Sequence, residues 1–241
     1  MSDKNTIIQD EFISTVSHEL RTPLTSIRGF SQNLLSSWDK LDEETKKKFI
    51  KIIEEQSGRL INLVENILTV SKIKNDRPIL RELNVNNSIE KLLQMFLLHG
   101  NTHNIVREFS ENLPHANLDE GKFQQIMTNL IDNACKYSKE GSKITISSNY
   151  INDSIVVSVS DEGTGIKKED FDKIFEKFVR LENHLTSKTQ GNGLGLYITK
   201  KLVESMNGKI TVTSEVNKGT KFTLIFPPYN SEEALKCSLQ S

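Results

Sequence analysis

Two long amphipathic helical patterns in the first third of the chain constrain its fold more than any other feature. From Ile13 to Leu34, apolar residues recur at steps of three and four, which places them in one stripe along a helix. After the polar stretch 36–45, a second pattern from Phe49 to Val70 repeats at about 3.5 residues, the coiled-coil period. Pro78 predicts that this second helix ends near residues 75–78.

Two such helices joined by a short loop form an antiparallel hairpin, which cannot enclose its own apolar stripe. A second copy of the hairpin can cover the stripe and complete a four-helix bundle. We therefore predict a homodimer whose core is built from these residues. The alternative is that both helices pack on the rest of the same chain.

The pattern changes after Pro78 to shorter segments of both kinds. Alternating apolar and polar residues predict strands, helical spacing predicts helices, and Asn217-Lys218-Gly219 is a turn sequence. Mixed strands and helices predict a two-layer α/β sandwich. The expected strands are 143–151, 154–163, 209–216 and 221–227, and the expected helices lie near 119–138 and 194–206.

These patterns divide the chain into successive parts. We expect a dimerising helical hairpin at 1–76, a linker at 77–82, an α/β domain at 83–229 and a disordered tail at 230–241.

Composition excludes several classes of protein. The chain has 31 Lys and Arg against 32 Asp and Glu, so no global field attracts nucleic acid. No apolar run approaches the roughly 18 residues of a membrane span, and we expect no membrane contact by this segment. Cys135 and Cys237 are too far apart in sequence to suggest a zinc site or a disulfide framework. A cytoplasmic segment is expected, and a longer parent protein with a membrane anchor is compatible with it.

His18 lies in the string SHELRTPLT, off the stripe of Val16, Leu20 and Leu24. Its ring is expected to face solvent, where an imidazole is a neutral nucleophile near pH 7, and Glu19 could take its ring proton. Pro23 costs about 3 kcal/mol inside a helix, which is unusual for a purely structural element. A solvent-facing histidine is nevertheless more often inert when it stands alone.

A second group of polar residues lies in the α/β part. Asn129 and Asn133 are four residues apart and share a helix face, so their amide oxygens could ligate Mg²⁺ or could simply be surface groups. Glycines follow a strand at 161–165 and open a helix at 191–195, where backbone N–H groups can approach a phosphate. Their spacing excludes both the dinucleotide fingerprint and the P-loop.

In chain order, several motifs resemble those of sensor histidine kinases. SHELRTPLTSIRGF resembles the H box, and NLIDNACKYS, DEGTGI, IFEKFVRLE, GNGLGL and GTKFTLIFP resemble the N, G1, F, G2 and terminal G boxes of the Bergerat ATP-binding fold. The resemblance implies a helical hairpin that forms a dimeric four-helix bundle, followed by an α/β two-layer sandwich that binds ATP and Mg²⁺.

The resemblance also assigns roles to residues of the helical part. His18 would accept the γ-phosphoryl group, Glu19 would assist as base, and Thr22 would orient a water for phosphatase chemistry.

In the α/β part the same resemblance assigns a nucleotide site. Asn133 and Asn129 would bind Mg²⁺, Lys136 and Arg180 would contact phosphates, Tyr137 would flank the nucleotide, and Asp161 would read the adenine amine. Residues 183–192 would form a lid, with Phe175 and Phe178 either anchoring it or lying in the core. The remaining members of the set, which shape the pocket and its lid, are Gly163, Gly165, Gly191, Gly193, Leu194, Gly195 and Thr220.

The implied function is an ATP-dependent kinase that phosphorylates His18, passes the phosphoryl group to an aspartate of a response regulator, and also dephosphorylates that regulator. The regulator is expected to dock along the helix face of Thr22, Thr25, Gly29 and Asn33, with Phe30 as an exposed anchor. Two alternatives remain: a Bergerat-type ATPase that forms no phosphohistidine, and a catalytically silent dimeric scaffold.

Overall fold

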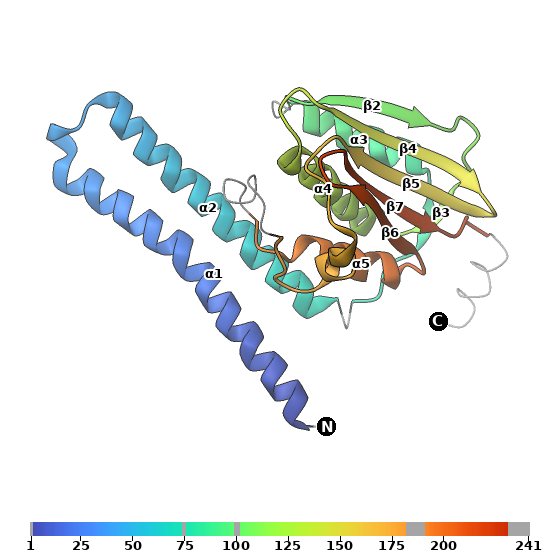
Figure 1. Cartoon of the computed structure of the whole chain (residues 1–241), viewed down its shortest axis with the longest axis horizontal. Coiled ribbons are helices and arrows are strands. Elements are labelled where there is room, and N and C mark those ends of the chain that lie inside the picture. The colour runs from blue at the N-terminus through green and yellow to red at the C-terminus, as the bar shows by residue number, and fades with distance from the viewer. Residues whose placement is uncertain (1, 74–75, 99–101, 182–190, 231–241) are drawn as a thin grey trace. The chain divides into compact units, whose positions relative to one another are not determined.

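The computed structural model describes residues 2–73, 76–98, 102–181 and 191–230, with side chains described from residue 13 onward. The chain separates into two compact units, residues 1–71 and 72–241, which Figure 1 shows as a helical hairpin and an α/β domain. Each unit is described by itself below.

The first unit consists of α1 (Ser2–Ser37) and α2 (Glu43–Lys72), joined through a short 3₁₀ helix, η1 (Trp38–Lys40). Asp42 precedes α2 and accepts hydrogen bonds from the Thr45 amide at 2.7 Å and from its hydroxyl at 3.2 Å, which satisfies a donor at the helix start. The predicted hairpin is confirmed. The predicted end of the second helix near 75–78 was too late, because α2 already ends at Lys72.

The two helices meet along a seam that includes the buried side chains of Pro23, Leu34 and Leu63. Phe30 is half-buried in this seam, and its ring centroid lies 5.0 Å from that of Phe49. The prediction of Phe30 as an exposed docking anchor is therefore wrong. An aromatic pair across the hairpin contributes about 0.5–1.5 kcal/mol to stability beyond the effect of its buried area. The Phe30 ring is engaged in this contact with Phe49.

A second apolar stripe on the hairpin stays uncovered within the chain. Its members are spaced by three, four or eleven residues, so they share one helix face, and between 43% and 59% of each side chain is exposed. They are Ile13 and Leu24 on α1, and Ile50, Ile61, Val64 and Leu68 on α2. Exposed apolar patches of this kind usually mark an interaction surface.

The second unit is built on a five-stranded sheet with the order β2-β4-β5-β7-β6, and a two-stranded sheet pairs β1 with β3. β2 runs parallel to β4, and all other neighbours are antiparallel. The strands are β1 (Arg81–Leu83), β2 (Asn104–Phe109), β3 (Ala116–Leu118), β4 (Lys143–Ile151), β5 (Ser154–Asp161), β6 (Lys209–Glu215) and β7 (Gly219–Phe226).

Three helices lie on one side of this sheet (Figure 1): α3 (Val85–Leu98), α4 (Glu120–Tyr137) and α5 (Gly195–Ser205). The short 3₁₀ helices η2 (Lys168–Asp170) and η3 (Lys173–Phe175) precede the third of them. Asp119 caps α4 by accepting a hydrogen bond from the Lys122 amide at 3.1 Å. Apolar residues of α4 are buried, and Phe123 packs edge-on against Phe226 at 6.1 Å. The expected two-layer α/β architecture is confirmed.

The strands and helices expected after residue 118 are all present, whereas β1, β2, β3 and α3 were not identified from the sequence. Residues 77–82, which the sequence suggested as a linker, include the start of β1. There Arg81 pairs with Leu118 and Glu82 with Asn117. These residues are therefore part of the α/β unit.

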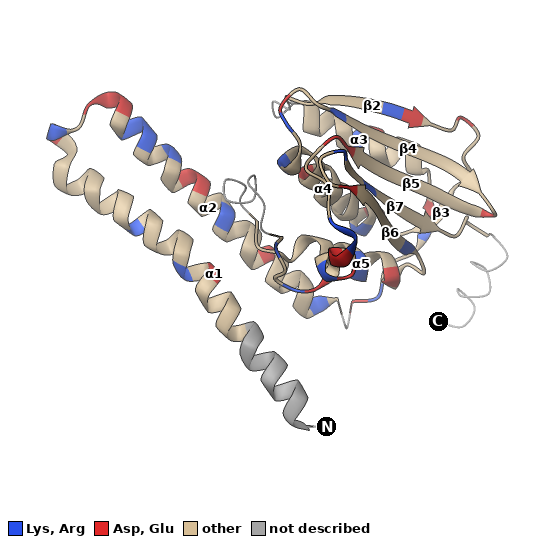
Figure 2. Ribbon diagram, viewed as in Figure 1, with Lys and Arg blue, Asp and Glu red and all other residues tan. Residues whose placement is uncertain are grey.

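Figure 2 shows residues of both charge signs along the described parts of the helical hairpin and of the α/β unit. Among the described residues, no helix combines the length and the hydropathy required to span a bilayer.

Candidate functional site

A pocket opens in the α/β unit beside the C-terminal ends of α4 and β5. The space inside it, with the open solvent at its mouth included, is about 620 Å³. Predicted site residues that line it come from four separate segments of the chain: Asn133, Tyr137, Asp161, Gly165, Arg180 and Thr220.

Asp161, at the end of β5, provides the pocket's buried charge, and only 9% of the residue is exposed. Its Oδ1 accepts hydrogen bonds from the amides of Gly163 at 2.8 Å and Thr220 at 3.2 Å. Burial raises the pKa of the Asp161 carboxyl to about 6, against the opposing effect of these two bonds. Among the described residues Oδ2 makes no hydrogen bond, so it can accept one from a ligand amine.

The loop after β5 follows the pocket wall closely. Thr164 donates its amide to the Tyr137 carbonyl at 3.1 Å, and its own carbonyl accepts from Asn217 at 2.8 Å. Gly165 has a φ of 68°, a left-handed conformation that favours glycine. A side chain there would collide with the backbone of Glu215. Gly165 therefore allows this loop to lie between α4 and the β6–β7 turn.

The C-terminal end of α4 contributes polar groups to the opposite wall. Asn133 and Tyr137 line the pocket, and the Asn133 amide makes no hydrogen bond within the described residues. Burial raises the pKa of the Tyr137 hydroxyl, while the positive charge of Arg180 opposes that shift. Lys136 is exposed and is not part of the pocket wall.

Asn129 and Asn133, which sequence spacing had assigned to one site, have different surroundings in the structure. Asn129 donates from Nδ2 to the Thr199 hydroxyl at 2.7 Å, and its Oδ1 occupies the position that a side chain at Gly195 would need. Asn129 thus joins α4 to α5 and does not line the pocket. Of the two, only Asn133 lines it.

Part of the predicted lid, residues 183–190, lies outside the described residues. On either side of that segment, the Phe178 amide donates to the Gly193 carbonyl at 2.9 Å, and Leu194 is fully buried. Gly191 lies in open space, and neither it nor Gly193 lines the pocket. Phe175 is half-buried and packs edge-on against Phe222 at 6.4 Å, and both interpretations of Phe175 stay predictions.

Sequence reasoning missed the apolar wall of the pocket. These side chains are dispersed over 57 positions, from Ile166 to Phe222, with no local pattern that would group them. Apolar side chains in the same lining as the buried carboxylate of Asp161 suit an aromatic ring that carries an amine. The wall consists of Ile166, Ile174, Val179, Leu181, Leu196 and Phe222.

His18 is exposed on α1 of the other unit, as predicted. The neighbouring Glu19 lies 3.7 Å from Arg59 of α2, and about a quarter of each side chain is exposed. The Thr22 hydroxyl donates to the His18 carbonyl at 3.3 Å. Histidine, carboxylate and threonine hydroxyl thus lie within little more than one helical turn.

Two family models match the chain. Residues 8–76 match the His Kinase A (phospho-acceptor) domain, and residues 118–230 match the histidine kinase-, DNA gyrase B-, and HSP90-like ATPase family. The chain belongs to the histidine kinase family.

Relatives of this chain are named as histidine kinases. This histidine kinase chain is 35% identical to the signal transduction histidine-protein kinase ArlS of Staphylococcus haemolyticus, over 90% of this chain and 48% of that protein. It is also 35% identical to the sensor histidine kinase WalK of Bacillus subtilis, over 92% of this chain and 37% of that protein. The chain therefore spans half or less of the length of these two relatives.

Solved structures agree with the fold. Histidine kinase ThkA in complex with the response regulator TrrA is similar with a TM-score of 0.75 and 28% identity, over 94% of this chain and 64% of that one. Full-length ShkA in complex with AMPPNP is similar with a TM-score of 0.66 and 27% identity, over 92% of this chain and 46% of that one.

Proposed function

We propose that this chain is an ATP-dependent protein histidine kinase that transfers the γ-phosphoryl group of ATP to His18. The observation that carries the proposal is the pairing, in one chain, of a solvent-exposed histidine on a phosphoacceptor hairpin with a separate pocket around the buried carboxylate of Asp161. Phosphoryl transfer needs positioning and charge stabilisation more than covalent chemistry, and these two sites supply a nucleophile and a nucleotide cradle.

The pocket has the polarity that ATP requires. Asp161 Oδ2 would accept from the adenine amine, with the apolar wall around the ring. Asn133 and Arg180 lie in the same lining and would face the phosphates. Lys136, exposed one helical turn from Asp132 on α4, is proposed to contact the phosphate end although it does not line the pocket.

Asn133 is also the proposed protein ligand for Mg²⁺. Its amide oxygen is a hard donor that lines the pocket and is unused by other described groups, and Mg²⁺ commonly takes one or two protein oxygens together with substrate phosphates and water. When bound, the ion would offset negative charge on the phosphates. Asn129 fits this role poorly, because its amide is engaged with Thr199.

At the acceptor, neutral His18 would attack the phosphorus while Glu19 takes the ring proton. Arg59 is close enough to Glu19 to orient its carboxylate. Thr22 is proposed to hold a water for regulator dephosphorylation. Its hydroxyl already donates to the His18 carbonyl, and the oxygen keeps lone pairs that can accept a hydrogen bond from that water.

The proposed partners are a second copy of the chain and a response regulator. The uncovered stripe on α1 and α2 supports the homodimer, because a matching stripe would complete the bundle core. The ThkA–TrrA complex supports a receiver-domain partner, and Thr22, Thr25 and Asn33 remain exposed for it. The balanced charge of the chain favours protein partners over nucleic acid.

Incubation of the chain with γ-labelled ATP distinguishes the proposal from both alternatives. Acid-labile, base-stable label on the protein supports the histidine kinase. Release of free phosphate without labelled protein would instead support a Bergerat-type ATPase, and nucleotide binding with neither product would support a silent scaffold.

A pH dependence of nucleotide affinity follows from Asp161. Burial places the folded-state pKa of Asp161 at about 6, above its ordinary value of 3.8, so the carboxyl gains a proton as the pH falls through 6. The ionised group is the stronger acceptor for an amine, and we expect ATP affinity to weaken several-fold between pH 7.5 and pH 5. The Asp161→Asn variant should bind ATP weakly, and its affinity should lack the part of the pH dependence that comes from Asp161. Calorimetric titration of both proteins across that range checks the result, and an identical pH profile in the two would contradict it.

The same shift has a consequence for stability. Because the folded pKa is raised, the stabilising contribution of Asp161 is full below pH 3.8 and is lost as the pH rises through about 6. At neutral pH, ionised Asp161 therefore lowers the free energy of unfolding. Its proposed role in binding the adenine amine explains why the carboxylate is present.

A further inference from the structure

The segment that leads from the helical unit into the α/β unit makes side-chain contacts with the start of α4. We propose that Asp76, Ile79, Asp119 and Lys122 form a linker latch, which holds this segment against α4 and thereby positions the nucleotide pocket for phosphoryl transfer to His18. The inference rests on the proposed kinase function and adds positioning residues outside the pocket.

The first contact of the linker latch is an ion pair. Asp76 Oδ2 lies 2.6 Å from Lys122 Nζ, and 59% of the Asp76 side chain but only 14% of the Lys122 side chain is exposed. The hydrogen bond from Lys122, together with its charge, lowers the pKa of Asp76. A comparison pair nearby, Lys91 with Glu120, is longer at 3.6 Å, and its side chains are 68% and 48% exposed. Exposed pairs of that kind contribute little, whereas a largely enclosed lysine is held in one geometry.

The second contact shares a residue with the cap of α4. Asp119 Oδ2 accepts from the Ile79 amide at 2.9 Å, while its Oδ1 accepts from the Lys122 amide at 3.1 Å. One carboxylate therefore joins the incoming chain to the first turn of the helix. Movement of residue 79 away from Asp119 would disturb the cap, which is typically worth about 1 kcal/mol.

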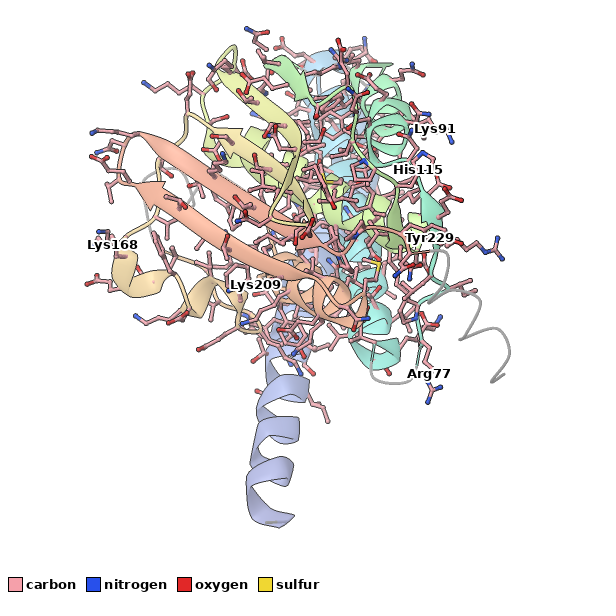
Figure 3. The ribbon with its side chains drawn as sticks, turned by 90° about the vertical axis from the view of Figure 1, so that its right-hand side faces the viewer. Arg77, Lys91, His115, Lys168, Lys209 and Tyr229 are labelled. Atoms are coloured by element: carbon pink, nitrogen blue, oxygen red, sulfur yellow. The ribbon has the colours of Figure 1, made fainter. Side chains whose placement is uncertain are left out.

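The strand that follows the latch is held to the same part of the domain. β1 pairs with β3, and His115 Nδ1 lies 2.7 Å from Glu82 Oε1. Figure 3 shows His115 on the side of the domain where Arg77, the neighbour of Asp76, extends away from the body. Every partner of the incoming segment named here thus lies within residues 115–122, directly before or inside α4, the helix that carries Asn133 and Tyr137.

The linker latch shortens the connection between the two domains. With the latch formed, Asp76 is the first residue bound to the α/β unit, and three residues separate it from Lys72, the last residue of α2. Without the latch, the first bound residue is Arg81 of β1, and eight residues separate it from Lys72. Once a tether is longer than the span that it must bridge, effective concentration falls with about the −3/2 power of its length. In that regime, releasing the latch should lower the encounter rate of the nucleotide site with His18 about fourfold.

Substitution of Lys122 tests the latch. Lys122→Met keeps the aliphatic stem and removes the charge, and Lys91→Met is the matched control at the exposed pair. At saturating ATP, we expect His18 labelling to be about fourfold slower in Lys122→Met, ATP affinity to stay within twofold, and Lys91→Met to match the wild type. The reversed pair, Asp76→Lys with Lys122→Glu, should recover the rate.

Hydrogen exchange at the Ile79 amide gives an independent measurement. Lys122→Met should exchange faster there, and Asp76→Asn, an exposed change that does not threaten folding, should do the same. Unchanged labelling in both variants, or slower labelling matched by an equal loss of ATP affinity, would overturn the latch. A wild-type chain that takes up no label would instead contradict the kinase proposal, and Ile79 exchange would then decide whether the latch exists.

Discussion

Replacing His18 with glutamine is expected to reduce acid-labile labelling by ATP to background while nucleotide affinity stays unchanged. Glutamine keeps a polar side chain on the exposed face of α1 but has no nucleophilic ring nitrogen. The nucleotide pocket lies in the other compact unit, so it should be unaffected. Labelling is measured after incubation with γ-labelled ATP, and affinity by calorimetric titration on the same preparation.

A histidine outside the hairpin gives the control for this substitution. His115→Gln removes an exposed imidazole that contacts Glu82, and it should retain most of the labelling. Residual acid-labile phosphate on the His18→Gln protein, or equal losses in both variants, would contradict the assignment of His18 as the acceptor.

Gly193→Ala is expected to weaken ATP binding by about tenfold or more. Gly193 has a φ of 66°, where a non-glycine residue costs about 1–2 kcal/mol. The new methyl group would also meet the backbone of Phe178. Since Val179 and Arg180 follow directly and line the pocket, the required shift moves the wall itself, and 1.4 kcal/mol corresponds to a tenfold change in affinity.

Gly191→Ala is the matched control, two residues earlier in the same motif. Among the described residues, no atom lies within 4 Å of the position that its methyl group would take, so we expect ATP affinity within twofold of the wild type. Thermal unfolding should also separate the pair, with a lower midpoint for Gly193→Ala only. Equal effects of the two substitutions would show that glycine composition, and not the geometry at Gly193, controls the site.

Local sequence was sufficient for the elements with strong periodicity. The stripes of the hairpin, the strands predicted at 143–151 and 154–163, and the helix that carries Asn133 are all present, with the second strand ending at Asp161. They were predictable because side chains at helical or strand spacing must share a face to be buried together. The strands β1 and β3 escaped prediction because each has three residues, too few to show a period.

Contacts between residues distant in sequence were decided only by the tertiary structure. From spacing alone, Asn129 and Asn133 were equally good candidates for a metal ligand. In the structure, Thr199 and Gly195 pack against Asn129, and this contact distinguishes it from Asn133. In the same way, contact with Phe49 on the second helix leaves Phe30 half-buried.

The sequence by itself predicted the chemistry proposed for this chain, since the proposed acceptor histidine and the nucleotide motifs are contiguous strings. The tertiary structure decided which side chains form one site. The apolar wall of the pocket and the contacts of Asp76 and Ile79 with the start of α4 join positions up to 56 residues apart. Burial or hydrogen bonding across such separations depends on the folded path of the chain, which no local pattern records.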